Sequence, residues 1–163
     1  MRPVRLEISG FSAFAESVVV DFADVELAAF VGPTGSGKSS VIDAMTFALY
    51  GAAARYDQRA VAPVINQLST EAKVRFDFQL SGTTYTAVRV VRRTRTGATT
   101  KEARLEAGGE VLAGDERALS AAVVDLLGLD FDKFNKTVVL PQGRFAEFLH
   151  DKRPWGKIGR AHV

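Results

Sequence analysis

The chain contains no cysteine, only two histidines, and no apolar run long enough to cross a bilayer. The missing thiols exclude a disulfide framework and a cysteine-based metal site. The most apolar stretch, residues 44–54, is shorter than a membrane span, and residues 1–10 alternate in polarity, unlike the apolar core of a secretory signal. We therefore expect a cytoplasmic protein with no membrane partner.

Neither sign of charge is in large excess, because the chain has 21 Lys and Arg residues and 19 Asp and Glu residues, for a net charge of +2. Such a small excess does not by itself indicate a nucleic-acid partner, so the placement of the basic residues matters more than their number. Hydrophobic residues make up 47% of the 163 positions. A chain of this size and composition can bury a core, and we expect one globular unit.

The first third of the chain predicts a sequence of strands, a glycine loop and a helix. Residues 4–9 and 17–22 alternate in polarity as strands do, and the apolar run 27–31 predicts a third, buried strand. Apolar residues then recur at helical spacing from Ser39 until Gly51, where a glycine that ends a helix is expected.

The rest of the chain predicts an antiparallel sheet followed by helices. Residues 52–69 have no clean period and indicate an irregular connection, with room for a short helix. The remaining predicted elements, in chain order, are a hairpin of strands 73–80 and 84–94, a turn at 97–100, weaker strands at 103–106 and 110–112, a helix between Asp115 and Gly128, a short helix at 131–137, a strand at 138–140 and a helical turn at 144–150.

Residues 32–39 read Gly-Pro-Thr-Gly-Ser-Gly-Lys-Ser and satisfy the spacing G-x-x-x-x-G-K-[ST] of a phosphate-binding loop. In such a loop, consecutive backbone N–H groups surround a phosphate at the start of a helix, and glycines allow backbone angles that a Cβ would block. Lysine then reaches the β- and γ-phosphates, and the serine hydroxyl ligates Mg²⁺. The predicted nucleotide contacts are Gly32, Pro33, Thr34, Gly35, Ser36, Gly37, Lys38, Ser39 and Ser40.

A hydrolytic acid is harder to find. Asp125 follows the apolar residues 121–124, as a water-activating acid follows a strand. Helical spacing, the glycine stop and Leu126 in place of a second acid favour a solvated helix residue instead. We interpret the chain as holding half of a site.

Two segments resemble SbcC-type ATPases. The first is residues 32–51, where Val-Ile-Asp-Ala and Ala-Leu-Tyr-Gly follow the loop; the second is residues 127–149, which contain Val-Val-Leu-Pro-Gln-Gly-Arg-Phe. The resemblance covers about residues 3 to 153 and implies an α/β P-loop NTPase fold: half of an ABC/SMC-type head, with a mixed sheet and an antiparallel β subdomain. It implies that the nucleotide is ATP, and that Gln142 contacts Mg²⁺ beside Ser39 and senses the γ-phosphate.

The same resemblance implies how the chain is organised. Residues 1–150 would be the N-terminal lobe of the head, and residues 151–157 the start of a coiled coil. Residues 158–163 back-translate to a common sequencing-adapter read, and we interpret them as an artefact. In this family the signature motif and Walker B acids lie beyond the coiled coil, so we expect the piece alone to hydrolyse ATP inefficiently.

The resemblance also implies a function and partners. The function is that of the ATP-binding lobe of a DNA double-strand-break repair and recombination ATPase, which regulates a nuclease at DNA ends. The implied partners are an SbcD-type nuclease subunit, the C-terminal half of the same head, a second head in an ATP-dependent dimer, and double-stranded DNA in the nucleoid. This chain has no cluster of His and Asp residues for two-metal cleavage, so cleavage would belong to the partner.

Basic residues gather between positions 89 and 104, a run that contains a single acid, Glu102. Clustered cations follow a DNA backbone, and the equal alternative is an ordinary solvated sheet face. The candidate DNA contacts are Arg89, Arg92, Arg93 and Arg95.

Three other functions remain open at this point. An ABC-transporter nucleotide-binding domain shares the P-loop and glutamine loop, but its signature motif should follow without a coiled coil. A GTPase or small-molecule kinase would need base-specificity or acceptor motifs that we do not find. A structural DNA clamp of the SMC or RecF type would differ only in its partner.

Overall fold

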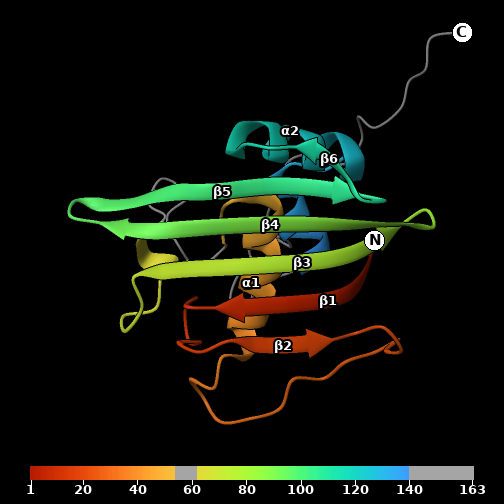
Figure 1. The fold of residues 1–163 in the computed structure, drawn as a ribbon. Coiled ribbons are helices and arrows are strands. Elements are labelled where there is room, and N and C mark those ends of the chain that lie inside the picture. The colour runs from red at the N-terminus through yellow and green to blue at the C-terminus, as the bar shows by residue number, and fades with distance from the viewer. Residues whose placement is uncertain (54–61, 140–163) are drawn as a thin grey trace, which may run out of the picture.

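Six strands form one sheet in the structure, a computed structural model that describes residues 1–53 and 62–139. Their spatial order is β2-β1-β3-β4-β5-β6, and every described pairing is antiparallel. Figure 1 shows the sheet as one layer with the helices behind it. The strands are β1 (Arg2–Ser9), β2 (Val18–Asp21), β3 (Glu71–Leu80), β4 (Thr83–Thr94), β5 (Gly97–Ala107) and β6 (Glu110–Ala113).

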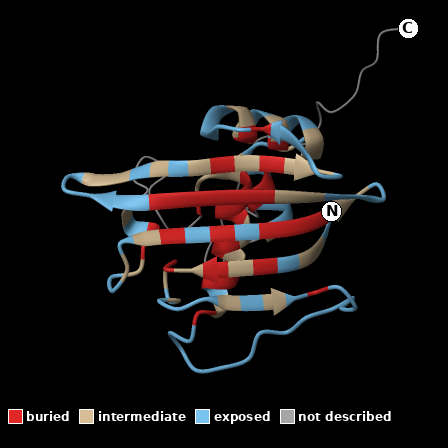
Figure 2. Ribbon diagram, viewed as in Figure 1, coloured by how far each residue is buried: buried red, intermediate tan, exposed pale blue. Residues whose placement is uncertain are grey.

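The inner face of the sheet carries the core because successive strand residues point to opposite faces. Leu6 and Ile8 of β1 and Val74, Phe76 and Phe78 of β3 are each 0% exposed. Two helices, α1 (Lys38–Tyr50) and α2 (Glu116–Leu127), cover this face. Bands of buried residues run along the middle strands in Figure 2. Each such side chain contributes about 1.5–3 kcal/mol on burial, so this contact holds the fold together.

Both long helices begin and end where the sequence predicts. Gly51 follows α1 with φ 73° and donates its N–H to the carbonyl of Phe47. Asp115 precedes α2 and accepts from the Ala118 N–H at 2.8 Å, and Gly128 closes α2 with φ 68°. The predicted hairpin is also confirmed, since β3 and β4 pair from Glu71–Arg92 to Leu80–Thr83.

Two local predictions are wrong. Residues 97–100 belong to β5, because the β4–β5 turn takes only residues 95–96. Val138 and Val139 lie in a wide helical turn, η2 (Asn135–Val139), which continues α3 (Phe131–Phe134), so they are not in a strand. Residue 140 and the helical turn predicted at 144–150 lie outside the described residues. A short turn, η1 (Ala62–Val64), agrees with the irregular connection expected at 52–69.

The strand predicted at 27–31 is also absent from the described structure. Leu27 is 92% exposed and Val31 is 91% exposed, and no residue from 27 to 31 is in a strand. A buried strand needs neighbours that bond its N–H and C=O groups. The described part of the chain gives this segment no such neighbour: it runs beyond β2, the last strand on that side (Figure 1).

The Asp115 cap can be tested locally. Asp115→Ala leaves the Ala118 N–H without its acceptor, so we expect α2 to lose about 1 kcal/mol. Amide hydrogen exchange in the first turn of α2 should accelerate about fivefold. Asp125→Ala is the matched control, because it removes the same charge from an exposed position of the same helix. Equal exchange rates in the two variants would contradict the capping role.

Candidate nucleotide site

The P-loop lies at the N-terminus of α1, a helix of 13 residues. Residues 32–36 are exposed, and Gly35 and Gly37 have φ values of 88° and 90°. Backbone N–H groups in such left-handed turns point into a concavity that binds anions, and the helix dipole adds positive potential there. A Cβ at Gly35 would meet nothing within 4 Å, so the loop is open on that side. This geometry fits a phosphate group.

Lys38 places its ammonium group at the same loop. Its Nζ donates to the carbonyl oxygens of Gly32 at 2.7 Å and Pro33 at 2.6 Å, and lies 3.4 Å from the Ser36 hydroxyl. A cation and a row of backbone donors therefore come from one short segment. Both are suited to the negative charge of a triphosphate.

The structure also reveals a support that sequence reasoning missed. A Cβ on Gly37 would lie 2.8 Å from Cζ of Phe14, so residues 11–14 pack directly against the loop. The hydroxyls of Ser12 and Ser40 are 2.9 Å apart, and Ser40 is only 3% exposed. The side chain of Ser40 therefore packs the loop onto the protein. The sequence signal was the pair Phe11 and Phe14, two aromatic residues between the predicted strands 4–9 and 17–22.

The predicted magnesium ligands are only half described. Ser39 is exposed in the first turn of α1, next to Lys38. Its hydroxyl suits Mg²⁺, which prefers oxygen ligands and is commonly shared with substrate phosphates. Gln142 lies outside the described residues. Within residues 1–53 and 62–139, no cluster of three or more acidic or histidine side chains offers an alternative metal site.

One of the four predicted DNA contacts is wrong. Arg89 is 1% exposed, because it shares the inner face of β4 with Ala87 and Val91. Its guanidinium donates to the carbonyl oxygens of Ala48 and Leu49 in α1. Burial lowers the pKa of Arg89 to about 10. This side chain is not available to DNA.

The other three arginines are exposed but differ in their partners. Arg92 pairs with Glu71 at 2.9 Å, and Arg93 donates to the carbonyl oxygens of Ile65 and Asn66. Arg95 lies in the exposed turn between β4 and β5. The basic run is therefore divided between two faces of the sheet and its turn.

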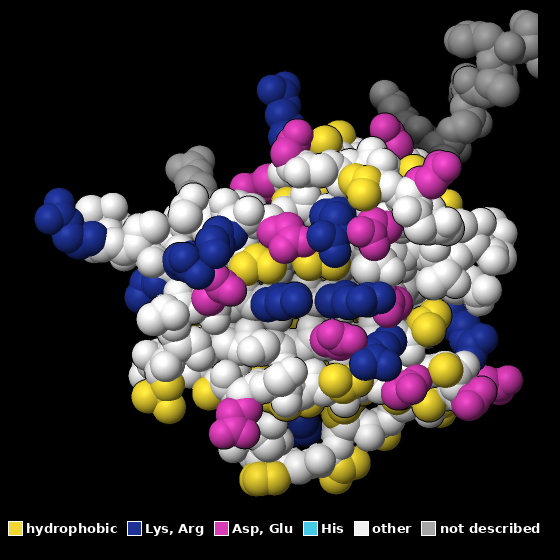
Figure 3. Space-filling view, viewed as in Figure 1, with side chains coloured by type: hydrophobic (Ala, Val, Ile, Leu, Met, Phe, Trp, Pro, Cys, Tyr) yellow, Lys and Arg dark blue, Asp and Glu magenta, His cyan; other side chains and the backbone are white. Residues whose placement is uncertain are grey.

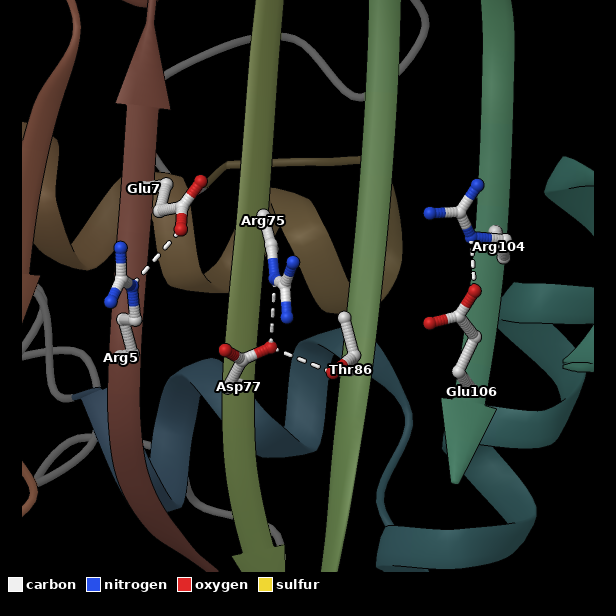
Figure 4. A network of polar contacts seen from close by, with 7 residues as sticks. All are labelled: Arg5, Glu7, Arg75, Asp77, Thr86, Arg104 and Glu106. Carbon is white, nitrogen blue, oxygen red and sulfur yellow. Dashed lines mark hydrogen bonds and ion pairs between the residues drawn. The ribbon is translucent and has the colours of Figure 1, made fainter. Parts of the chain in front are cut away.

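The outer face of the sheet mixes both charge signs, as the interspersed basic and acidic side chains of Figure 3 show. Figure 4 shows three ion pairs, each between two residues of one strand, on β1, β3 and β5. Their distances are 3.0 Å for Arg5–Glu7, 3.1 Å for Arg75–Asp77 and 2.7 Å for Arg104–Glu106, and Thr86 donates to Asp77 at 2.7 Å. The hydrogen bond to Asp77 raises the pKa of Arg75. Along the chain the basic run 89–104 holds one acid, but Glu71 of β3 pairs with Arg92 and Glu106 of β5 pairs with Arg104.

A family model described as an AAA domain matches residues 5–154. The chain belongs to this AAA-domain family. It is 43% identical over 155 residues to the SbcC component of the nuclease SbcCD from Deinococcus radiodurans, covering 93% of this chain and 17% of that protein. It is 36% identical over 159 residues to a probable DNA double-strand break repair Rad50 ATPase from Aquifex aeolicus, covering 97% and 16%.

The SMC head domain from Thermotoga maritima is a solved structure with a TM-score of 0.47 and 27% identity, covering 69% of this chain and 39% of that chain. Family membership, with the P-loop helix on an antiparallel sheet, confirms the predicted α/β nucleotide-binding fold. The AAA-domain chain spans about a sixth of the length of the two curated relatives. These relatives give no support to the transporter alternative. Among the described helices, none has the length and apolarity that crossing a membrane requires.

The packing of Phe14 on the loop gives a matched test. Gly35→Ala and Gly37→Ala both place a side chain at a positive φ, but only the second meets Phe14. We expect Gly37→Ala to lower the free energy of unfolding by about 1–3 kcal/mol more than Gly35→Ala, measured without nucleotide. Adding Phe14→Leu should shrink the difference. Equal losses in the two glycine variants would rule out the contact with Phe14.

Proposed function

We propose that this chain is the ATP-binding lobe of an SbcC- or Rad50-type DNA double-strand-break repair ATPase, cytoplasmic and associated with the nucleoid. The observation that carries the proposal is the P-loop at the start of α1 with Lys38 at its mouth. The similarity to SbcC and Rad50 proteins supports the choice of ATPase over other P-loop proteins.

The loop residues divide the work of binding. Backbone N–H groups of residues 34–39 would hold the β-phosphate, and Lys38 would leave its carbonyl partners to neutralise the β- and γ-phosphates. Ser39 would share Mg²⁺ with the phosphates, and Gln142 would supply an amide oxygen to the same ion. The magnesium ion would neutralise charge that develops during hydrolysis.

The remaining parts of the site would come from elsewhere. Leu27, Phe30 and Val31 are exposed beside the loop, and the C-terminal half of the same head would cover this apolar segment and supply the acids of hydrolysis. A second head would close the site in an ATP-dependent dimer, and an SbcD-type nuclease would cut DNA. We propose a coiled coil after residue 150 as the connection between the two halves.

The first test is Lys38→Ala in the complete ATPase. Loss of the ammonium should weaken ATP binding by about 10- to 100-fold, because charge-assisted hydrogen bonds to phosphate are worth about 1.5–3 kcal/mol. Isothermal titration with a slowly hydrolysed ATP analogue measures this. Lys136→Ala is a control of equal charge change at an exposed helical position. Unchanged ATP affinity in Lys38→Ala would reject the proposed site.

DNA binding is the second part of the proposal. The turn between β4 and β5 carries Arg95, and Arg92 and Lys101 lie near it with only Glu71 as their ion-pair partner among the described residues. This end of the sheet therefore has excess positive charge, whereas the ion pairs of Figure 4 are balanced. Excess cations are what a phosphate backbone requires.

Charge reversal tests whether DNA binds the end of the sheet at the β4–β5 turn or the balanced ion pairs of its outer face. Arg92→Glu with Arg95→Glu should weaken duplex binding by the complete ATPase and reduce the slope of log affinity against log salt by about 1 to 2. Arg5→Glu with Arg104→Glu is the matched control, since it reverses two arginines of the balanced network. Equal effects of both double variants on the slope would reject the turn as the DNA contact.

A further inference from the structure

Arg89 is an unusual residue for the interior of a small sheet. It is 1% exposed, and none of its hydrogen bonds among the described residues goes to a carboxylate. Burial is the main cause of its lowered pKa of about 10. The negative charge of Glu116 raises the pKa, but by less than burial lowers it. The guanidinium still carries its charge near neutral pH. A buried charge without an ionic partner is costly, so its contacts need a physical account.

Those contacts converge on the last turn of α1. Nε donates to the Ala48 carbonyl at 3.1 Å and Nη2 to the Leu49 carbonyl at 3.2 Å. These oxygens belong to the carbonyls that a helix leaves unpaired at its C-terminus, where the dipole is negative. α1 has no basic residue of its own in the last turn. The cation that completes this helix end therefore comes from β4.

The same guanidinium reaches a third element. Nη2 also donates to the Ser120 hydroxyl of α2 at 2.9 Å, and that hydroxyl donates to the Glu116 carbonyl. Nη1 has no hydrogen-bond partner in the described structure and lies close to Gly51, where an added Cβ would approach it to 3.0 Å. One side chain thus joins the end of α1, the middle of the sheet and α2.

Directional contacts add to the placement of α1, because its apolar packing holds it on the sheet but is not itself directional. Val41, Ala44, Phe47 and Leu49 are buried, and hydrogen bonds add a direction that apolar burial lacks. A helix of 13 residues is about 20 Å long and moves as a rod. A displacement at its C-terminus therefore moves the phosphate-binding N–H groups at its N-terminus.

We infer that Arg89 is a positioning residue for ATP binding, which fixes the P-loop helix from its C-terminal end through the carbonyls of Ala48 and Leu49. The inference rests on the proposed nucleotide site. Arg89 touches neither nucleotide nor loop, and it acts through the placement of α1.

The test uses Arg89→Met and Arg89→Lys in the complete ATPase. Methionine retains bulk but no donor, and we expect the dissociation constant for ATP to rise about tenfold or more in the folded protein. Lysine keeps one charged donor group and should restore part of the affinity. Ser120→Ala removes only the contact with α2 and should leave ATP affinity near the wild-type value.

A supporting role in the fold alone predicts a different outcome. It would lower the unfolding temperature and the active fraction of Arg89→Met, while the folded molecules would bind ATP with wild-type affinity and show an unchanged KM. That result would overturn the inference. If wild-type protein and Lys38→Ala bind ATP equally, the nucleotide site itself fails, which is a separate outcome.

A second pair of variants applies even where Arg89→Met does not fold. Gly51→Ala and Gly128→Ala each place a side chain at the end of a helix with φ 73° or 68°, so their backbone strain is similar. Only the Cβ at position 51 meets the Arg89 guanidinium; the one at position 128 has open space. We expect weaker ATP binding in Gly51→Ala alone. Equal ATP affinity in both variants would contradict the inference.

Discussion

The packing of α1 on the inner face of the sheet is the contact on which the rest of the structure depends. Leu6, Ile8 and Phe76 belong to the same buried apolar cluster as the buried side of α1. Because α1 is placed by this contact, its N-terminus carries the P-loop to a defined edge of the domain. The position of the loop, in contrast to its local geometry, thus depends on sheet register, which decides which side chains face the helix.

Local chemistry explains why much of this fold is predictable from the sequence. Asp115 caps α2 and Gly51 and Gly128 end helices through interactions within a few residues, so their identity is enough to place them. The P-loop is equally local, since its glycines, lysine and serine act within eight consecutive positions. Strand alternation predicted the β3–β4 hairpin for the same reason.

The features that the sequence did not reveal depend on contacts between distant segments. In the sequence, Arg89 resembles its basic neighbours. The register of β4 directs its side chain toward α1, where it bonds Leu49, which lies 40 residues earlier in the chain. Glu71 of β3 lies outside the basic run, yet it forms an ion pair with Arg92 on the adjacent strand β4. Phe14 supports Gly37 from the connection between β1 and β2. In each case the deciding partner is known only once the strands are paired.

The segment 27–31 also depends on contacts with distant segments, and here such a contact is missing from the described structure. Its apolar run predicts a buried strand, yet Leu27 and Val31 are exposed, because a strand exists only with a neighbour. The P-loop is therefore held unequally in the described chain. Its C-terminal side is fixed by α1, Phe14 and Arg89, while its N-terminal side follows a segment without strand pairing. A strand that paired with residues 27–31 would supply this side of the loop with the backbone hydrogen bonds that it lacks among the described residues.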